Sequence, residues 1–189
     1  MKFAGLTFAE IKMPNDLKEI NGWQKTYAGT QQLQNIKTFV LDCSANLSLG
    51  QLIDHHYEKF AIGNREFKKI ITIKNDNREI VAFAVIQAFY DLDPTKPEFL
   101  IQFLVVNPKY QNKGFGTKTL DGLFEYIKKT YKHDDCEYLV GVHKNNEASQ
   151  HLFKKRGFEF HEVRGDYLLH GRASSEMVKQ SLQENKTFE

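Results

Sequence analysis

The chain has 189 residues, of which 41% are hydrophobic, 26% charged and 13% aromatic, and its formal net charge is +2 at pH 7. This length suits one domain that buries roughly 70% of its unfolded surface, so no metal or disulfide staple is required. The near-balanced charge argues against a nucleic-acid-binding protein. No apolar run approaches the ~20 residues of a membrane span.

Cysteine usage and the N-terminus bear on the cell compartment. Cys43 and Cys136 are the only cysteines and do not form a CxxC pair. Two reduced, packing cysteines are the preferred interpretation, and a single disulfide is the alternative. The first residues, MKFAGLTFAEIK, lack the apolar core of a secretory signal and reach Glu10 early. We therefore expect a cytoplasmic protein.

The first third of the chain is the hardest to interpret. Residues 1–36 are polar, include the only tryptophan, Trp23, and show no clear periodicity. TFVLDC (38–43) predicts a strand. LSLGQLIDHHYEKFAI (47–62) places apolar residues at helical spacing and predicts a helix.

The middle of the chain predicts strands. FKKIITIK (67–74) and EIVAFAVIQAFY (79–90) flank the polar stretch KNDNRE and predict a hairpin. DLDPTKPE (91–98) holds two prolines and predicts a loop. FLIQFLVV (99–106) is almost continuously apolar, which is typical of a strand covered on both faces.

A helix follows the next loop. Leu120, Leu123, Phe124 and Ile127 fall at i, i+3, i+4 and i+7. Gly122 lies inside this helix, where glycine costs about 1 kcal/mol relative to alanine.

The last part of the chain predicts a strand, a short helix and a hairpin. EYLVGV (137–142) is a buried-type strand, a helix starts at Asn146 and Gly157 ends it. FEFHEV (158–163) and YLLHG (167–171) predict a hairpin across RGD.

These elements predict a mixed, three-layer α/β fold. The strand–helix–strand order between 99 and 142 implies a parallel pair with a right-handed crossover, and the hairpins imply antiparallel neighbours. We expect a single domain over residues 1–172, with 1–36 as its variable part. Residues 173–189 form a helical or frayed tail in this interpretation.

The stretch NPKYQNKGFGTKTL (107–120) contains the most informative loop. Gly114 and Gly116 stand between an apolar strand and a helix start, where free N–H groups and the helix dipole can bind an anion. A glycine turn that only closes the corner is the alternative. The stretch is neither a P-loop, because Thr117 follows Gly116, nor a dinucleotide fingerprint, because Thr119 replaces its third glycine.

At this loop the sequence resembles a known family. VVNPKYQNKGFGTK resembles the acetyl-CoA-binding motif V-x-P-x-[YF]-[QR]-x-x-G-x-[GA] of GNAT-type N-acetyltransferases. The matching residues are Val106, Pro108, Tyr110, Gln111, Gly114 and Gly116. VHKNNEASQHLFKKRGF (142–158) resembles the family's second signature through Val142, Asn146, Ser149, Leu152, Gly157 and Phe158. The resemblance covers about 65–170 and implies the GNAT fold with its central mixed sheet.

The resemblance implies acetyl-CoA as cosubstrate. Its pyrophosphate would lie on backbone N–H groups between Gln111 and Thr117, and its pantetheine arm would pair with the end of the preceding strand. The implied cofactor-binding residues are Leu104, Val105, Val106, Gln111, Asn112, Lys113, Gly114, Phe115, Gly116, Thr117, Asn146 and Phe153. Lys113 either adds charge at the phosphates or is a solvated lysine. Asn146 caps its helix, contacts the cofactor, or does both.

The implied reaction is direct acetyl transfer to a primary amine of a small molecule, peptide or protein. Many family members carry a glutamate base where this chain has Gln102, and a tyrosine acid where it has Phe153. We assign Glu98, acting through water, and Gln102 as candidate catalytic residues. The other candidates for proton transfer are His143, Tyr110, Tyr138 and Tyr167. A non-catalytic acyl-CoA-binding sensor or scaffold is the alternative function.

The expected partners are acetyl-CoA and an amine acceptor, without nucleic acid or membrane, and a homodimer is one of the assemblies open to the chain. We expect no metal site, because His55 and His56 diverge on a helix and HDDC (133–136) is typical of a solvated loop.

Overall fold

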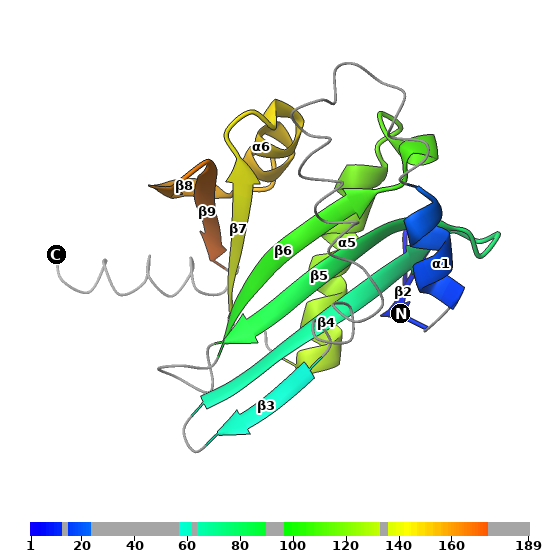
Figure 1. Cartoon of the computed structure of the whole chain (residues 1–189), viewed down its shortest axis with the longest axis horizontal. Helices are drawn as coiled ribbons and strands as arrows, with labels where there is room; N and C mark the ends of the chain where they lie inside the picture. The colour runs from blue at the N-terminus through cyan, green and yellow to red at the C-terminus, as the bar shows by residue number, and fades with distance from the viewer. Residues whose placement is uncertain (13–14, 24–56, 62–63, 90–96, 133–135, 174–189) are drawn as a thin grey trace, which may run out of the picture. The chain divides into compact units, whose positions relative to one another are not determined.

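A computed structural model of the protein describes residues 1–12, 15–23, 57–61, 64–89, 97–132 and 136–173 (Figure 1). The chain divides into two compact units. The first unit comprises Met1–Tyr57, Lys68–Ile86 and Gln102–Tyr126, and the second comprises Glu58–Phe67, Gln87–Ile101 and Ile127–Glu189. Strands β4, β5 and β6 and helix α5 continue from one unit into the other, and each unit is described by itself.

The first unit contains a sheet with the strand order β1-β2-β4-β5-β6 (Figure 1). The strands are β1 (Lys2–Phe3), β2 (Leu6–Glu10), β4 (Asn64–Lys74), β5 (Ile80–Phe89) and β6 (Glu98–Val106). β2 pairs antiparallel with both β1 and β4. Asn75 N donates to Glu79 O at 3.0 Å where β4 turns into β5, which confirms the predicted hairpin.

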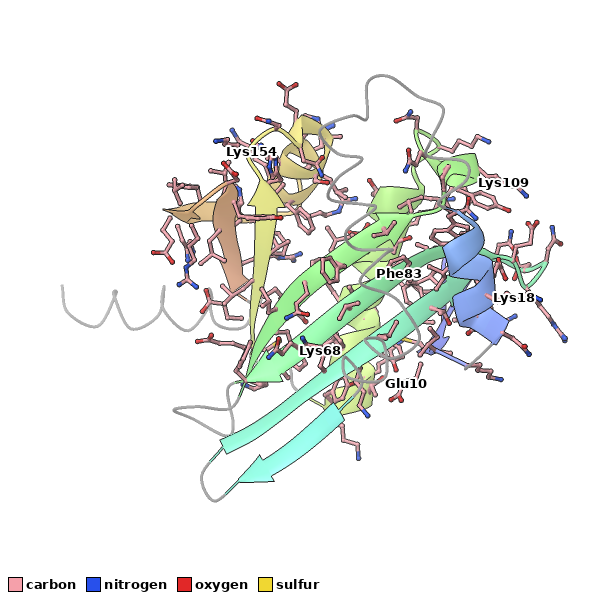
Figure 2. All side chains as sticks on the ribbon, in the orientation of Figure 1. Glu10, Lys18, Lys68, Phe83, Lys109 and Lys154 are labelled. Carbon is pink, nitrogen blue, oxygen red and sulfur yellow. The ribbon has the colours of Figure 1, made fainter. Side chains whose placement is uncertain are left out.

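Helices α1 (Asn15–Gly22) and α5 (Phe115–Tyr131) cover opposite faces of this sheet. Ile20 and Trp23 pack with Phe83 of β5, which Figure 2 labels, in one core cluster. On the other face, the ring of Phe8 lies 6.4 Å from that of Tyr126 of α5. Phe8 pairs with Ile73 of β4, whereas Thr72, the next residue, hydrogen-bonds to α1. The alternation of side chains along a strand therefore puts the two helices on opposite faces.

Asp16 fixes the start of α1 to the sheet. Its buried carboxylate accepts hydrogen bonds from Lys74 Nζ at 2.6 Å, from Lys12 N at 2.9 Å and from Thr72 Oγ1 at 3.3 Å. Burial pushes the pKa of Asp16 upward, but these hydrogen bonds and the Lys74 charge outweigh it, so the pKa lies below its ordinary value.

The second unit contains the strand order β6-β7-β9-β8. Its further elements are β3 (Tyr57–Ala61), which pairs with β4, β7 (Glu137–His143), α6 (Glu147–Lys154), β8 (Glu159–Arg164) and β9 (Tyr167–Ala173). β6 and β7 are parallel over the pairs from Glu98–Glu137 to Ile101–Val140. β9 is antiparallel to both β7 and β8. The predicted parallel pair and the last hairpin are confirmed.

The mixed α/β fold class is thus confirmed, but two predicted details are wrong. Residues 57–61 form strand β3 rather than the end of a helix, while 47–56 lie outside the described residues. β5, not β6, is the strand buried along nearly its whole length, and β6 is half-buried at Leu100, at 102–104 and at Val106.

Other predictions fall outside the described residues or meet them only in part. The predicted strand 38–43, Cys43, most of the loop 91–98 and the tail beyond residue 173 are not described. Cys136 is a buried free thiol. Within the described part of the chain, the helices are too short or too polar to cross a membrane.

Candidate functional site

The loop between β6 and α5 is held to the sheet by Asn107. Its backbone N–H donates to Val81 O at 2.9 Å, and its side-chain Nδ2 donates to Ile80 O at 3.1 Å. Its Oδ1 accepts from Lys109 N at 3.0 Å and starts the short helix η2 (Pro108–Tyr110). Asn107 is only 8% exposed, and its backbone N–H, its Nδ2 and its Oδ1 each make a hydrogen bond within the first unit. Asn107 was not predicted as a functional residue, although Asn-Pro is a turn signal.

The backbone after η2 turns twice into the left-handed region. Asn112 has φ 57° and Gly114 has φ 77°. A Cβ added at Gly114 would meet no atom within 4 Å, so the backbone conformation and not the space requires glycine there. Gln111, the residue before Asn112, is extended, with φ −64° and ψ 154°. Where a left-handed residue follows a right-handed one, the successive N–H groups turn toward one side and can form an anion-binding concavity.

Helix α5 begins directly after these turns. Its hydrogen-bond ladder begins with Lys118 N donating to Gly114 O at 3.2 Å. Helix geometry gives the N–H groups of Phe115, Gly116 and Thr117 no acceptor within α5, and the helix dipole adds partial positive charge at this end. The left-handed turns at Asn112 and Gly114 and the start of α5 therefore both favour the binding of an anion at this loop.

The polar side chains of the loop stabilise it from within. Gln111 Nε2 donates to Val106 O at 3.1 Å, and the Gln111 N–H donates to Pro108 O at 3.4 Å. That N–H is therefore engaged in this structure, and the predicted anion-binding segment begins after it. Lys113 Nζ donates to Lys109 O at 2.8 Å, so its ammonium lies against the exposed loop. Lys118 Nζ lies 5.6 Å from the centre of the Phe115 ring.

Tyr110 faces the turn between β4 and β5. Its hydroxyl donates to Glu79 Oε2 and accepts from Asn75 Nδ2 at 3.2 Å, and its ring lies 5.0 Å from that of Phe115. The hydrogen bond to Glu79 is the main cause that raises the pKa of Tyr110 above its ordinary value. The phenol is therefore protonated at neutral pH and directed at Glu79.

The end of β6 supplies the other predicted cofactor residues. Val105 is buried in the core cluster that contains Trp23, and Gln102 and Leu104 are half-buried. β6 runs on to Val106, whereas its parallel ladder with β7 covers Glu98–Ile101. Glu98 opens the strand, is exposed, and stands at the opposite end of β6 from the loop.

The remaining candidates belong to the second unit. Asn146 caps α6 through Oδ1, which accepts from Ser149 N at 3.1 Å, so its predicted capping role is confirmed. Phe153 is buried with its ring centre 5.1 Å from that of Phe158.

Three proton-transfer candidates also have structural roles there. His143 Nδ1 accepts from Asn145 N, and its ring meets Tyr167 edge-on at 5.5 Å. Tyr138 is buried, with its ring 6.2 Å from that of Phe99. Among the residues that the structure describes, no three His, Cys, Asp or Glu side chains are grouped to hold a metal ion.

Comparison with known proteins identifies the family. A family model described as the acetyltransferase (GNAT) family matches residues 39–158, which is more than half of the chain. The chain belongs to the GNAT family. The match covers the loop between β6 and α5, and it extends through α6 to Phe158.

A curated relative of the GNAT chain is the spermine/spermidine N(1)-acetyltransferase of Bacillus subtilis (strain 168). The two are 28% identical over 85 residues, which are 43% of this chain and 54% of that protein. The chain thus aligns with about half the length of this relative.

Solved structures share the fold of the GNAT chain. The PaiA N-acetyltransferase from Thermoplasma acidophilum, in complex with coenzyme A, is 19% identical with a TM-score of 0.57, covering 89% of this chain and 98% of that one. The spermidine N-acetyltransferase from Vibrio cholerae, in complex with CoA and spermine, is 13% identical with a TM-score of 0.55, covering 93% and 99%. The ribosomal-protein-S18-alanine N-acetyltransferase from Escherichia coli is 15% identical with a TM-score of 0.57, covering 90% and 94%.

Proposed function

We propose that this protein is an acetyl-CoA-dependent N-acetyltransferase that passes the acetyl group directly to a primary amine. The observation that carries this proposal is the loop after β6. It combines the left-handed turns at Asn112 and Gly114 with the start of α5, in the stretch that resembles the family's acetyl-CoA-binding motif.

The loop would hold the CoA pyrophosphate. N–H groups from Asn112 to Thr117 would donate to its oxygens, as helix N-termini do for other anions. Lys109, Lys113 and Lys118 add positive charge along the same segment, and charge-assisted hydrogen bonds are the strong ones. The pantetheine arm would lie along Leu104–Val106. Asn146 and Phe153 complete the proposed set from the second signature.

The proposed chemistry is a single acyl transfer. The amine nitrogen attacks the thioester carbonyl carbon, the C–N bond forms and the C–S bond breaks. The amine, with a free pKa of roughly 10, loses its proton, and the CoA thiolate takes one up. A backbone N–H near Val106 would stabilise the charge that develops on the thioester oxygen. Orienting the two reactants contributes several kcal/mol of the rate enhancement without a dedicated acid.

Gln102 and Glu98 are the proposed catalytic residues. Gln102 cannot accept a proton at neutral pH, but its amide can orient the amine or a water molecule at the middle of β6. Glu98 would act through water from the start of that strand. Tyr110 is less suited than either because its hydroxyl already donates to Glu79.

The acceptor and the setting are part of the same proposal. Polyamines are the first acceptors to test, because spermine and spermidine acetyltransferases are among the relatives. A cytoplasmic location is supported by the free thiol of Cys136, which suits a reducing compartment. A homodimer stays a prediction, and sedimentation velocity measures it.

The test is release of free CoA from acetyl-CoA with a panel of amines: spermidine, spermine, a lysine peptide and a peptide with a free N-terminus. We expect at least one amine to raise the release rate well above the rate of hydrolysis. Tight acetyl-CoA binding with no turnover of any amine would contradict the proposal.

A non-catalytic acyl-CoA sensor is the second candidate, favoured by Gln102 and by the buried Phe153 at the two usual proton-transfer positions. If Gln102→Glu or Phe153→Tyr creates activity that the parent lacks, the sensor is the better account. A parent that acetylates an amine, with a rate that falls on the acidic side of its pH profile, is instead an enzyme, since the amine must lose its proton to react.

A further inference from the structure

We infer that the turn between β4 and β5 positions the loop between β6 and α5, with Glu79 and Tyr110 as the positioning residues. The inference rests on the proposed function for what the loop binds. The contacts themselves lie entirely within the first unit and do not depend on any ligand.

Several hydrogen bonds hold the turn together and make it a support for the loop. Asn75 N donates to Glu79 O at 3.0 Å, Arg78 N donates to Asn75 O at 2.9 Å, and Arg78 is left-handed with φ 64°. Asn75 Oδ1 accepts from Glu79 N, and Asn75 Nδ2 donates to Glu79 Oε2, both at 3.0 Å. These bonds within the turn orient the Glu79 carboxylate independently of the loop.

The loop is attached to this support at two places. Tyr110 is attached through its hydroxyl to Glu79 and to Asn75. Asn107 is attached through its backbone and side chain to Val81 O and Ile80 O. Ile80, whose carbonyl accepts from Asn107, also donates through its N–H to Glu19 Oε1 of α1 at 2.9 Å. This residue is therefore hydrogen-bonded to both the loop and α1.

The two attachments lie at the start and the end of η2, at Asn107 and Tyr110. The conformation of the residues that follow is set by their own backbone dihedral angles. Tyr110 precedes the left-handed Asn112 by two residues, and its ring packs on Phe115 at the start of α5. The hydrogen bond from Tyr110 is the main cause that lowers the pKa of Glu79 below its ordinary value. The carboxylate is therefore ionised at neutral pH. Loss of the Tyr110 hydrogen bond to Glu79 would thus loosen the loop both before Asn112 and at the start of α5, where Phe115 lies.

The test compares Tyr110→Phe, Glu79→Ala and Glu79→Gln in the full chain. Tyr110→Phe keeps the ring and removes the hydroxyl, and Gln retains an oxygen that accepts from it. Glu162→Ala in β8 is the control, since Glu162 is likewise an exposed carboxylate that accepts from a close donor, Arg164 Nε. Amide hydrogen exchange of 111–117 in the ligand-free protein is read first, and the KM for acetyl-CoA and kcat second.

We expect Tyr110→Phe and Glu79→Ala to speed exchange of 111–117 and to raise the KM for acetyl-CoA about three- to tenfold, with kcat within about twofold. Glu79→Gln should keep the exchange rate and the KM close to the parent values. The double variant Tyr110→Phe/Glu79→Ala should have an exchange rate and a KM no higher than those of either single variant. Unchanged loop exchange in both variants, or a loss of kcat with KM intact, would overturn the inference. Absence of acetyl-CoA binding in the parent would refute the proposed function. The exchange data would still decide whether Glu79 and Tyr110 position the loop.

Discussion

Gly122 shows at the scale of one residue why helix propensity alone misleads. A Cβ at this position would lie 2.2 Å from Cζ and 2.5 Å from Cε2 of the buried Phe8. The sequence predicts only the cost of glycine in a helix, whereas the structure shows that α5 needs glycine to approach β2. We expect Gly122→Ala to lower the free energy of unfolding by about 1–3 kcal/mol, measured by denaturant titration.

The control is Gly141→Ala in β7, where an added Cβ meets nothing within 4 Å. It should change the free energy of unfolding far less. If Gly122→Ala instead stabilised the protein, as the propensity scale predicts, the packing of α5 on Phe8 would be wrong.

Asp16 is a second residue-scale case, because its buried ion pair with Lys74 at 2.6 Å joins α1 to β4. Asp16→Asn should cost about 3 kcal/mol, since it leaves the Lys74 ammonium without its counter-charge. Glu10→Gln is the control, because Glu10 lies 3.9 Å from Lys69 and is 44% exposed, and exposed pairs contribute about 0–1 kcal/mol.

The Asp16 contribution should depend on pH in one direction. Its pKa is lower in the folded than in the unfolded state, so its stabilisation is fully present above the unfolded pKa of about 3.9. It is lost as the pH falls through the folded pKa. The stability difference between parent and Asp16→Asn should therefore shrink in acid. A difference that grew in acid would contradict the assigned ion pair.

Local chemistry explains which residues the sequence could predict. The Asn146 cap and the left-handed Gly114 follow from rules that operate within a few residues. Asn107, Asp16 and Trp23 were missed because their partners lie 26 to 60 residues away: Asn107 at Val81, Asp16 at Lys74, and Trp23 at Phe83. Such distant contacts leave no periodic signal.

The loop after β6 is best tested at the scale of the element. Gly114→Asp would force a left-handed backbone on a side-chain residue and add a carboxylate beside the proposed pyrophosphate. We expect the affinity for acetyl-CoA to fall more than about tenfold by isothermal titration. Gly165→Asp in the β8–β9 turn is the control, because Gly165 also has positive φ, at 61°.

If both glycine variants lost affinity equally, or neither did, the loop would not be the phosphate site. The pair separates the general cost of a side chain at positive φ, which the two variants share, from effects local to the loop, which only Gly114→Asp produces.

Element boundaries were predicted where hydrophobic pattern and turn residues agreed. The β4–β5 hairpin, β6, α5 and the β8–β9 hairpin satisfy both conditions. Residues 57–61 do not, because the apolar spacing of 47–62 fits a helix and YEKFA lacks the alternation of a strand. Pairing with β4 decides the outcome. Burial of β5 rather than β6 likewise depends on neighbours on both faces, which the chain order does not reveal.

For the whole molecule, we expect the two units to unfold together. Strands β4, β5 and β6 and helix α5 each contribute residues to both units. We expect Trp23 fluorescence, which reports on the first unit, and far-UV circular dichroism to give the same denaturation midpoint. Two separate midpoints would contradict the predicted single domain.

In the proposed function, the backbone of the loop after β6 holds the CoA pyrophosphate. Amide hydrogen exchange with and without saturating CoA tests it most directly, because it reads the N–H groups themselves. We predict that CoA slows exchange most strongly within 112–117, with Gly165 and the rest of the β8–β9 turn unchanged. CoA binding that leaves 112–117 unprotected would contradict the account.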